Sequence, residues 1–350
     1  MFSDLIGNEK VKSSLIHLLT SGRLPNSLLF AGPDGVGKKQ FAIELARAFV
    51  CRQPIDSLAC GECSACRRVG DFNTPTSEKG EDHDHVFFGE HSDVGLVIPF
   101  NRNLRVGAIR ALEIQANYRP YEARARVFIV NDAEKMNDAA ANALLKTLEE
   151  PSDTTYIILI ASRPDALLST IRSRCQTIRF APVAADEIER FLIDKNSIAP
   201  TDAQLASKYS KGSIARALNF DITQFRAERD AQLATIEAAL VDKNRPSLIR
   251  ASERMNDAKN KERFEENLGI LESLVRDVWL LKNCCGPKLM TNSDILEKLR
   301  DLADSISTKP LAAFLAEIES LRSGLNVNTN RKIATEALFC RMTIDNATAG

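Results

Sequence analysis

The chain has 350 residues, of which 44% are hydrophobic and 27% charged, and its formal net charge is −1. This composition is typical of a soluble globular protein with two or three domains. A net charge so close to zero excludes a strong overall attraction to nucleic acid or to an anionic membrane, so any contact with DNA must come from a local patch or from a larger assembly.

The N-terminal segment, MFSDLIGNEKVKSSL, alternates charged with apolar side chains and lacks the uninterrupted apolar run of a signal peptide. No apolar run in the chain approaches the length of a membrane span. We therefore expect a cytoplasmic protein with no membrane partner. In that compartment the eight cysteines stay reduced and do not form a disulfide framework.

The first half of the chain alternates short apolar runs with helical patterns, as in a parallel sheet covered by helices on both faces. The expected strands are Ser27–Gly32, Arg126–Asp132, Thr155–Ser162 and Gln176–Pro182. The helix after the first strand carries Phe41, Leu45 and Phe49 on one face. A later helix, AAANALLKTLEE, ends at Pro151. We expect residues 1–181 to form a doubly wound α/β domain.

A glycine-rich loop, AGPDGVGKKQ, follows the first strand. Gly32, Gly37 and Lys38 fill the phosphate-binding pattern G-x-x-x-x-G-K-[ST], and Gly35 lies between the two glycines. Lys39 stands where a Ser or Thr hydroxyl would hold magnesium, and an ammonium group cannot ligate a cation. Two interpretations stay open: a strand-to-helix turn retained for folding, or weak binding of a nucleotide or another anion at the start of the next helix.

Four of the cysteines lie within sixteen residues in the spacing C-x8-C-x2-C-x2-C: Cys51, Cys60, Cys63 and Cys66. Thiolates at this spacing can surround one tetrahedral zinc ion, and four of them close its coordination sphere, so the zinc would be structural. A reactive or redox-active cluster is the alternative. The other cysteines are expected to be core thiols: Cys175, Cys284, Cys285 and Cys340.

Residues 71–105 include the polar run TPTSEKGEDHDHVFFGEHSD, which has no clear helical period. We expect a long loop or an insertion. It contains His83, His85 and His91, which are either metal ligands or, as we favour, parts of a solvated loop.

The second predicted strand ends in Asp132, a residue type that holds magnesium in nucleotide-hydrolysing enzymes. The next residue in such enzymes is commonly a Glu that polarises the attacking water, but here it is Ala133. Glu134 follows and, in extended backbone, would point to the other side. Lys39 and Ala133 are two independent losses, and together they argue against hydrolysis.

Arg174 lies in the segment STIRSRC, directly before the last predicted strand. It is either a structural ion-pair partner or an arginine finger that reaches a nucleotide held by a neighbouring subunit. A finger of this kind raises the rate of hydrolysis by about 10³–10⁵.

After Pro182 the strand-like runs end. Residues 182–222 are expected to form a small helical lid and residues 223–350 a second helical domain. In the latter, one helix places a continuous apolar stripe on one face: Phe264, Leu268, Leu271, Val275, Val278 and Leu281.

Taken together, the opening segment FSDLIGNEKVKSSL, the glycine loop, the cysteine module, NALLKTLEEP and SRC resemble the AAA+ subunits of the bacterial clamp loader over nearly the whole chain. Within that family the chain is most similar to the delta-prime subunits of DNA polymerase III. The gamma/tau subunits have Ser or Thr where this chain has Lys39, and Glu where it has Ala133. They also carry a sensor Arg after a Gly-Ser pair, where this chain has Ala215 followed by Arg216.

The resemblance implies a heteropentamer of delta, three gamma/tau copies and delta-prime, an accessory assembly of the polymerase that opens the β sliding clamp and closes it around primed DNA. In it, Arg174 would complete the ATP site of the adjacent gamma/tau subunit, the cysteine module would bind zinc, and residues 223–350 would form part of a collar. The degenerate loop, with Asp132, would bind ATP weakly or not at all.

Two other functions are open. One is a gamma/tau-type ATPase with unusual chemistry, which Lys39 and Ala133 disfavour. The other is an unrelated zinc-containing AAA+ protein of repair or recombination, for which SRC together with this cysteine spacing would not be expected.

Overall fold

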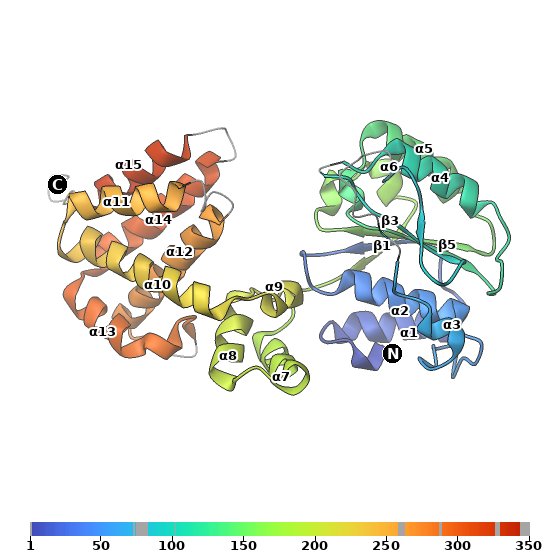
Figure 1. The fold of residues 1–350 in the computed structure, drawn as a ribbon, viewed down its shortest axis with the longest axis horizontal. Helices are drawn as coiled ribbons and strands as arrows, with labels where there is room; N and C mark the ends of the chain where they lie inside the picture. The colour runs from blue at the N-terminus through green and yellow to red at the C-terminus, as the bar shows by residue number, and fades with distance from the viewer. Residues whose placement is uncertain are drawn as a thin grey trace. The chain divides into compact units, whose positions relative to one another are not determined.

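Short apolar runs form a six-stranded sheet in the computed structural model, in the order β2-β3-β4-β5-β1-β6 (Figure 1). The strands are β1 (Ser27–Ala31), β2 (Phe87–Phe88), β3 (Val94–Val97), β4 (Arg126–Val130), β5 (Thr155–Ala161) and β6 (Gln176–Arg179). All neighbouring strands are parallel except β2 and β3. The predicted parallel α/β fold is confirmed, and the four predicted strands correspond to β1, β4, β5 and β6.

The structure describes residues 2–72, 74, 83–101, 103–257, 263–286, 289–325 and 330–343. The chain divides into two units. The sheet unit consists of Met1–Ser197 and Ser210–Leu218, and the helical unit consists of Ile198–Tyr209 and Asn219–Gly350. The predicted three-way division at residues 181 and 222 is a finer one and stays a prediction.

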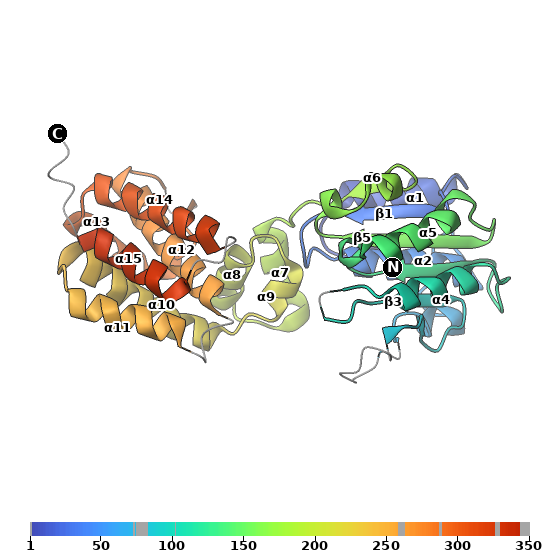
Figure 2. The same ribbon diagram turned by 90° about the horizontal axis from the view of Figure 1, so that it is seen from above.

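Helices cover both faces of the sheet. On one face lie α1 (Glu9–Thr20) and α2 (Lys38–Val50), and on the other lie α4 (Val106–Ala116), α5 (Asp138–Glu149) and α6 (Ser169–Arg172) (Figures 1 and 2). The remaining helices of the sheet unit are η1 (Phe2–Asp4), α3 (Ser64–Arg67), η3 (Ala133–Lys135), η4 (Pro164–Ala166), α7 (Ala185–Asn196) and α9 (Ile214–Leu218). The sheet is therefore buried on both sides.

Strand β5 shows why the predicted strands read as continuous apolar runs. Ile158 and Ile160 pack towards the α1–α2 face, whereas Ile157 and Leu159 pack towards the α4–α5 face. Successive side chains of a strand point to opposite faces, so a strand covered on both sides needs an apolar residue at every position.

Helices α2 and α5 follow their sequence signals. Phe41, Leu45 and Phe49 all point from α2 into the core, as predicted. Helix α5 begins after Asn137, whose side-chain oxygen accepts a hydrogen bond from the backbone N–H of Ala140 (2.9 Å). This cap satisfies one of the free N–H groups at the start of the helix.

For residues 71–105 the prediction is a long loop or an insertion; the long loop is wrong for the described part, and the insertion stays a prediction. Residues 73, 75–82 and 102 lie outside the described residues, but β2 and β3 form one edge of the sheet. His91 is 1% exposed and His83 8% exposed, so neither belongs to a solvated loop, whereas His85 is exposed as predicted. The strand escaped prediction because only four residues, Val94–Val97, carry its pattern and one of them is glycine.

The helical unit is built around α12 (Phe264–Lys282), which packs against α10, α13 and α14. The predicted apolar stripe of α12 is buried, with Leu281 partly so. The other helices of the unit are α8 (Pro200–Tyr209), α10 (Ile222–Ile236), η5 (Glu237–Val241), α11 (Arg245–Asn256), η8 (Ser293–Ile295), α13 (Leu296–Ser305), α14 (Thr308–Leu325) and α15 (Arg331–Thr343). In the described part of the chain, no helix is both long and apolar enough to cross a membrane.

The scattered cysteines differ from one another. Cys175 is a core thiol as predicted, and burial raises its pKa to about 12. The prediction is wrong for Cys284 and Cys340, which are exposed. Cys284 follows the end of α12 in left-handed backbone, and Cys340 lies on the outer face of α15, so apolar character alone did not decide their burial.

Candidate functional site

The carboxyl ends of parallel strands meet at one edge of a sheet, where open α/β folds commonly bind ligands. At this edge the glycine loop follows β1, Asp132 follows β4 and Ser162 follows β5. A cavity of about 500 Å³ opens there, a volume typical of small-molecule sites. Lys38 and Lys39 line it together with Asp132, opposite apolar side chains from the N-terminal segment, α7 and α9. The structure thus brings the predicted nucleotide-site residues together.

The glycine loop is packed closely against the start of α9. Gly35 and Gly37 have φ angles of 74° and 97°, which other residues rarely adopt. A side chain at Gly35 would overlap that of Ser213. The backbone N–H of Ala215 donates to the Gly35 carbonyl oxygen (3.1 Å), and the following Arg216 is exposed. The loop therefore has protein, not open solvent, on this side.

Lys38 turns its ammonium group back onto the loop. Its Nζ donates to the carbonyl oxygens of Gly32 (2.7 Å) and Pro33 (2.6 Å) and lies 3.4 Å from the hydroxyl oxygen of Ser162. The residue is 4% exposed. Burial lowers the pKa of Lys38, and the nearby carboxylates oppose this only in part. The Lys38 ammonium group, which would contact a phosphate in a nucleotide-binding loop, is thus already hydrogen-bonded to carbonyl oxygens of its own loop.

The residues near Asp132 do not fit a magnesium site. The Asp132 carboxylate accepts a hydrogen bond from the Nζ of Lys135 (2.9 Å) and so has an ion-pair partner. Burial lowers the pKa of Lys39, while Asp132 raises it. Magnesium requires several oxygen ligands in octahedral geometry, and Lys39 supplies a positive charge in place of a hydroxyl.

Glu134 is committed to a structural contact. Its Oε1 accepts hydrogen bonds from the backbone N–H groups of Ser162 (2.9 Å) and Arg163 (3.3 Å), directly after β5. The expectation of extended backbone here is wrong, because residues 133–135 form the 3₁₀ helix η3. Ala133 is fully buried. Glu134 therefore ties the end of β4 to the end of β5.

Arg174 lies away from the cavity and is not among the residues that line it. It follows α6, and its Nη1 donates to the carbonyl oxygen of Thr170 (2.9 Å). Its guanidinium also pairs with the carboxylate of Glu149, the last residue of α5. The ion-pair partner expected by one interpretation is present, and the finger role in a neighbouring site stays a prediction.

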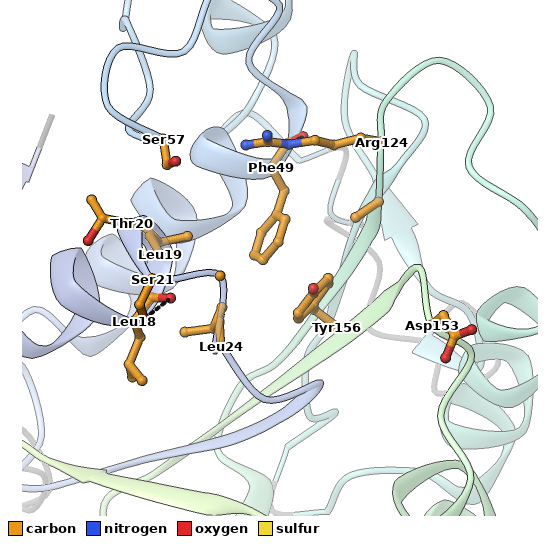
Figure 3. Close-up of a pocket in the computed structure, with 12 residues that line it drawn as sticks. Leu18, Leu19, Thr20, Ser21, Leu24, Phe49, Ser57, Arg124, Asp153 and Tyr156 are labelled. Carbon is orange, nitrogen blue, oxygen red and sulfur yellow. Dashed lines mark hydrogen bonds between the residues drawn. The ribbon is translucent and has the colours of Figure 1, made fainter.

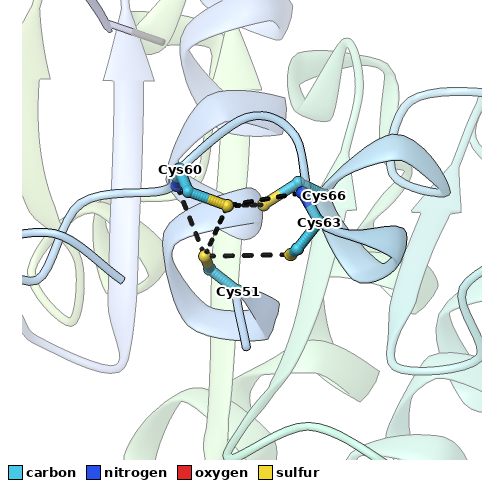
Figure 4. A group of neighbouring side chains, drawn as sticks. All are labelled: Cys51, Cys60, Cys63 and Cys66. Carbon is cyan, nitrogen blue, oxygen red and sulfur yellow. Dashed lines mark hydrogen bonds between the residues drawn. The ribbon is translucent and has the colours of Figure 1, made fainter. Parts of the chain in front are cut away.

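The four cysteine side chains converge so closely that they could hold a metal ion (Figure 4). The sulfur atoms of Cys51, Cys60, Cys63 and Cys66 all lie within 4.8 Å of one another. Three of their separations are 3.5, 4.0 and 4.0 Å. Zinc–sulfur bonds of about 2.3 Å at tetrahedral angles place the sulfur atoms about 3.8 Å apart. In the part of the chain that the structure describes, these four cysteines are the one cluster of His, Cys, Asp or Glu side chains that could hold a metal ion.

Charged groups attach the cysteine module to the sheet. Arg68 donates two hydrogen bonds to the Glu122 carboxylate (both 2.7 Å), and Arg52 donates a third (2.9 Å). These hydrogen bonds, that of Arg68 above all, lower the pKa of Glu122 to about 2. The backbone N–H of Glu122 in turn donates to the fully buried Asp93 (2.9 Å). No local sequence pattern indicated this anchor, because its residues are far apart along the chain.

A second cavity, of about 430 Å³, lies at the opposite edge of the sheet, where β4 and β5 begin (Figure 3). Phe49 and Tyr156 stack in its wall, with ring centroids 4.0 Å apart. Arg124 lines it while donating to the carbonyl oxygens of Ala48 (2.7 Å) and Phe49 (3.2 Å). None of the residues predicted to form a site lines this cavity, so we do not assign it to the candidate site.

Sequence reasoning missed the contacts that three residues make with predicted site residues. Ser213 and Ala215 close the loop, and the only signal for them was the segment GSIARAL, which the resemblance singled out for another reason. Glu149 belongs to LLKTLEEP, a motif quoted without a role for this residue. Its pairing with Arg174 joins two motifs that are separated in sequence.

Comparison with known proteins gives a consistent assignment. Residues 7–184 match the family model described as DNA polymerase III, delta subunit. The chain is 28% identical to DNA polymerase III subunit delta' of Bacillus subtilis, covering 91% of this chain and 92% of that protein. It is 28% identical to the Escherichia coli subunit of the same name, covering 94% and 92%. It is 30% identical to E. coli subunit tau, covering 67% of this chain but only 34% of tau.

Proposed function

The chain belongs to the DNA polymerase III delta-subunit family and is a clamp-loader subunit, and from this membership we propose that it is a delta-prime subunit that does not hydrolyse ATP itself. Its partners would be the gamma/tau and delta subunits in a cytoplasmic heteropentamer, with residues 223–350 in the collar. Through that complex it would act on the β sliding clamp and on primed DNA.

The main support for the proposal that the chain does not hydrolyse ATP comes from the hydrogen bonds within the glycine loop. Lys38 donates to two carbonyl oxygens of the loop, and Ala215 donates to a third, so the loop is stabilised by the chain's own groups. Lys39 and the ion-paired Asp132 supply no magnesium site. Weak contacts of Gly32, Gly35, Gly37 and Lys38 with a nucleotide would not by themselves provide catalysis.

We propose that Arg174 acts as an arginine finger on the ATP of an adjacent gamma/tau subunit. Its side chain is 34% exposed at the end of α6, outside the cavity of its own chain. A guanidinium in such a position can reach a phosphate of another subunit, where it stabilises the charge of the transition state.

We propose that the four cysteines hold one structural zinc ion. The distances between their sulfur atoms suit tetrahedral coordination, and four thiolates leave no open position for water. The ion would hold the short α3 segment against the end of α2 and would take no part in the chemistry.

The decisive experiment measures ATP turnover with primed DNA and clamp for the chain alone, for gamma/tau with delta, and for all three. We expect no turnover by the chain alone and stimulation of the mixture by the wild-type chain. Arg174→Ala should abolish most of this stimulation. Arg172→Ala, which removes a nearby charge at the end of α6 that is paired with Asp165, should not. Robust turnover by the purified chain would instead indicate a gamma/tau-type ATPase.

A further inference from the structure

Arg174 is held in place by groups from two helices. Its guanidinium pairs with Glu149 at the end of α5, donates to the Thr170 carbonyl oxygen (2.9 Å) and lies 3.5 Å from the hydroxyl oxygen of Ser173. The side chains of Arg174 and Glu149 are 34% and 48% exposed, so the pair lies at the surface of the sheet unit. The next residue along the chain, Glu150, is exposed, and in the described part of the chain no hydrogen bond or ion pair joins its side chain to Arg174.

A carboxylate and a phosphate bind a guanidinium in the same way, through two or three planar N–H groups. Surface ion pairs are also weak, because water screens them and because holding two long side chains together costs entropy. The Glu149 carboxylate can therefore be exchanged for a phosphate oxygen without unfolding either helix. The nearby Arg172 does not compete for Glu149, because its Nη1 donates a hydrogen bond to the carboxylate of Asp165 (2.9 Å).

We infer that Glu149 is a positioning residue that holds the Arg174 guanidinium in a resting place until the triphosphate of the adjacent subunit replaces the carboxylate. This inference rests on the finger role proposed above. It reconciles the two interpretations of Arg174, since the intramolecular ion pair is the resting state of the finger. Each engagement of the finger must then break the pair, so Glu149 opposes capture of the finger by ATP.

The expected consequence is a rise in catalytic efficiency when the carboxylate is removed. In the complete complex with gamma/tau and delta, Glu149→Gln should raise kcat/KM for ATP by up to about fivefold, the factor that corresponds to a surface ion pair. Most of this change should appear as a lower KM for ATP, and kcat should not fall. A purely structural ion pair would instead change the thermal stability of the chain and leave KM unchanged.

The test uses the reconstituted complex with five forms of this chain: wild type, Glu149→Gln, Arg174→Ala, the double variant, and Glu150→Gln as the control for loss of one negative charge. Circular dichroism of each free chain checks that it is folded. Support requires that Glu149→Gln raises kcat/KM, that Glu150→Gln does not, and that Glu149→Gln has no effect when Arg174 is already alanine.

The two proposals fail in different ways. If Arg174→Ala leaves turnover unchanged, the finger role is wrong and the inference about Glu149 falls with it. If Arg174→Ala lowers turnover but Glu149→Gln behaves like Glu150→Gln, or lowers kcat/KM, then only the resting-place role of Glu149 is overturned.

Discussion

Replacing Lys38 by methionine removes the ammonium group and keeps an unbranched side chain of similar length. In the folded chain this group donates hydrogen bonds of 2.7 and 2.6 Å to the carbonyl oxygens of Gly32 and Pro33. Hydrogen bonds to a charged group contribute about 1.5–3 kcal/mol each, so the two contribute about 3–6 kcal/mol. Burial of the charge, which also lowers the pKa of Lys38, offsets part of this. We expect the free energy of unfolding of the sheet unit to fall by about 2–3 kcal/mol.

The assay must report on the sheet unit. The single tryptophan, Trp279, lies in α12, so its fluorescence follows the helical unit. Hydrogen exchange measured by mass spectrometry over residues 27–50 follows β1, the glycine loop and α2 directly. Lys39→Met is the matched control, because the Lys39 ammonium donates no hydrogen bond to any described residue. This substitution should therefore change the hydrogen exchange little.

The same variant separates a structural lysine from a catalytic one. We expect Lys38→Met to weaken protection in residues 27–50 while ATP turnover of the reconstituted complex stays within about twofold of wild type, because the lysine serves the loop and not a nucleotide. The reasoning would be refuted if exchange were unchanged and turnover were lost, since Lys38 would then be acting on phosphate.

Two further predictions concern the cysteine module. Cys63→Ser should lower the zinc content, measured by atomic emission, from one ion per chain towards zero. Cys340→Ser, which changes an exposed thiol outside the cluster, should leave the zinc content unchanged. Full zinc occupancy in the Cys63 variant would exclude the four-thiolate site. Because folding lowers the pKa of Glu122 from 4.5 to about 2, its contribution to stability is complete above about pH 5 and disappears as the pH falls to about 2. Glu122→Gln should therefore lower the free energy of unfolding at pH 7. Urea unfolding of the metal-free wild type and the metal-free variant should show that the difference in their free energies of unfolding shrinks below about pH 4.5. A difference that does not depend on pH would contradict this account.

The sequence predicted those parts of the fold that depend on local patterns. Strands β1, β4 and β5 are buried on both faces, so their apolar runs are continuous and hard to mistake. The stripe of α12 and the Asn137 cap of α5 are equally local. Strand β3 was missed because its four residues contain Gly95, and a larger side chain there would collide with Phe128. Its polar neighbours are buried by contacts with other parts of the sheet unit, which no local pattern records.

The candidate site was predicted less completely for the same reason. The cysteine cluster is encoded by spacing alone, and its four sulfur atoms indeed converge. The partners of Lys38, Glu134 and Arg174 are backbone or side-chain groups that only the folded chain brings near, such as the N–H of Ser162 and the carboxylate of Glu149. Sequence reasoning identified which residues were unusual but not what they contact.

These contacts explain which parts of the nucleotide-binding loop remain and which do not. Gly35 must be glycine because Ser213 lies against it, and Lys38 binds the carbonyl oxygens of the loop, so both positions serve the fold whether or not a nucleotide binds. A hydroxyl at position 39 would serve only magnesium, and a Glu at position 133 would serve only the attacking water. Ala133 is fully buried in the core between β4 and the helices, so a charged side chain there would also cost free energy. If Arg174 acts on a neighbouring subunit as proposed, this chain needs the loop only as a support for α2 and α9, and it needs neither of the two missing groups.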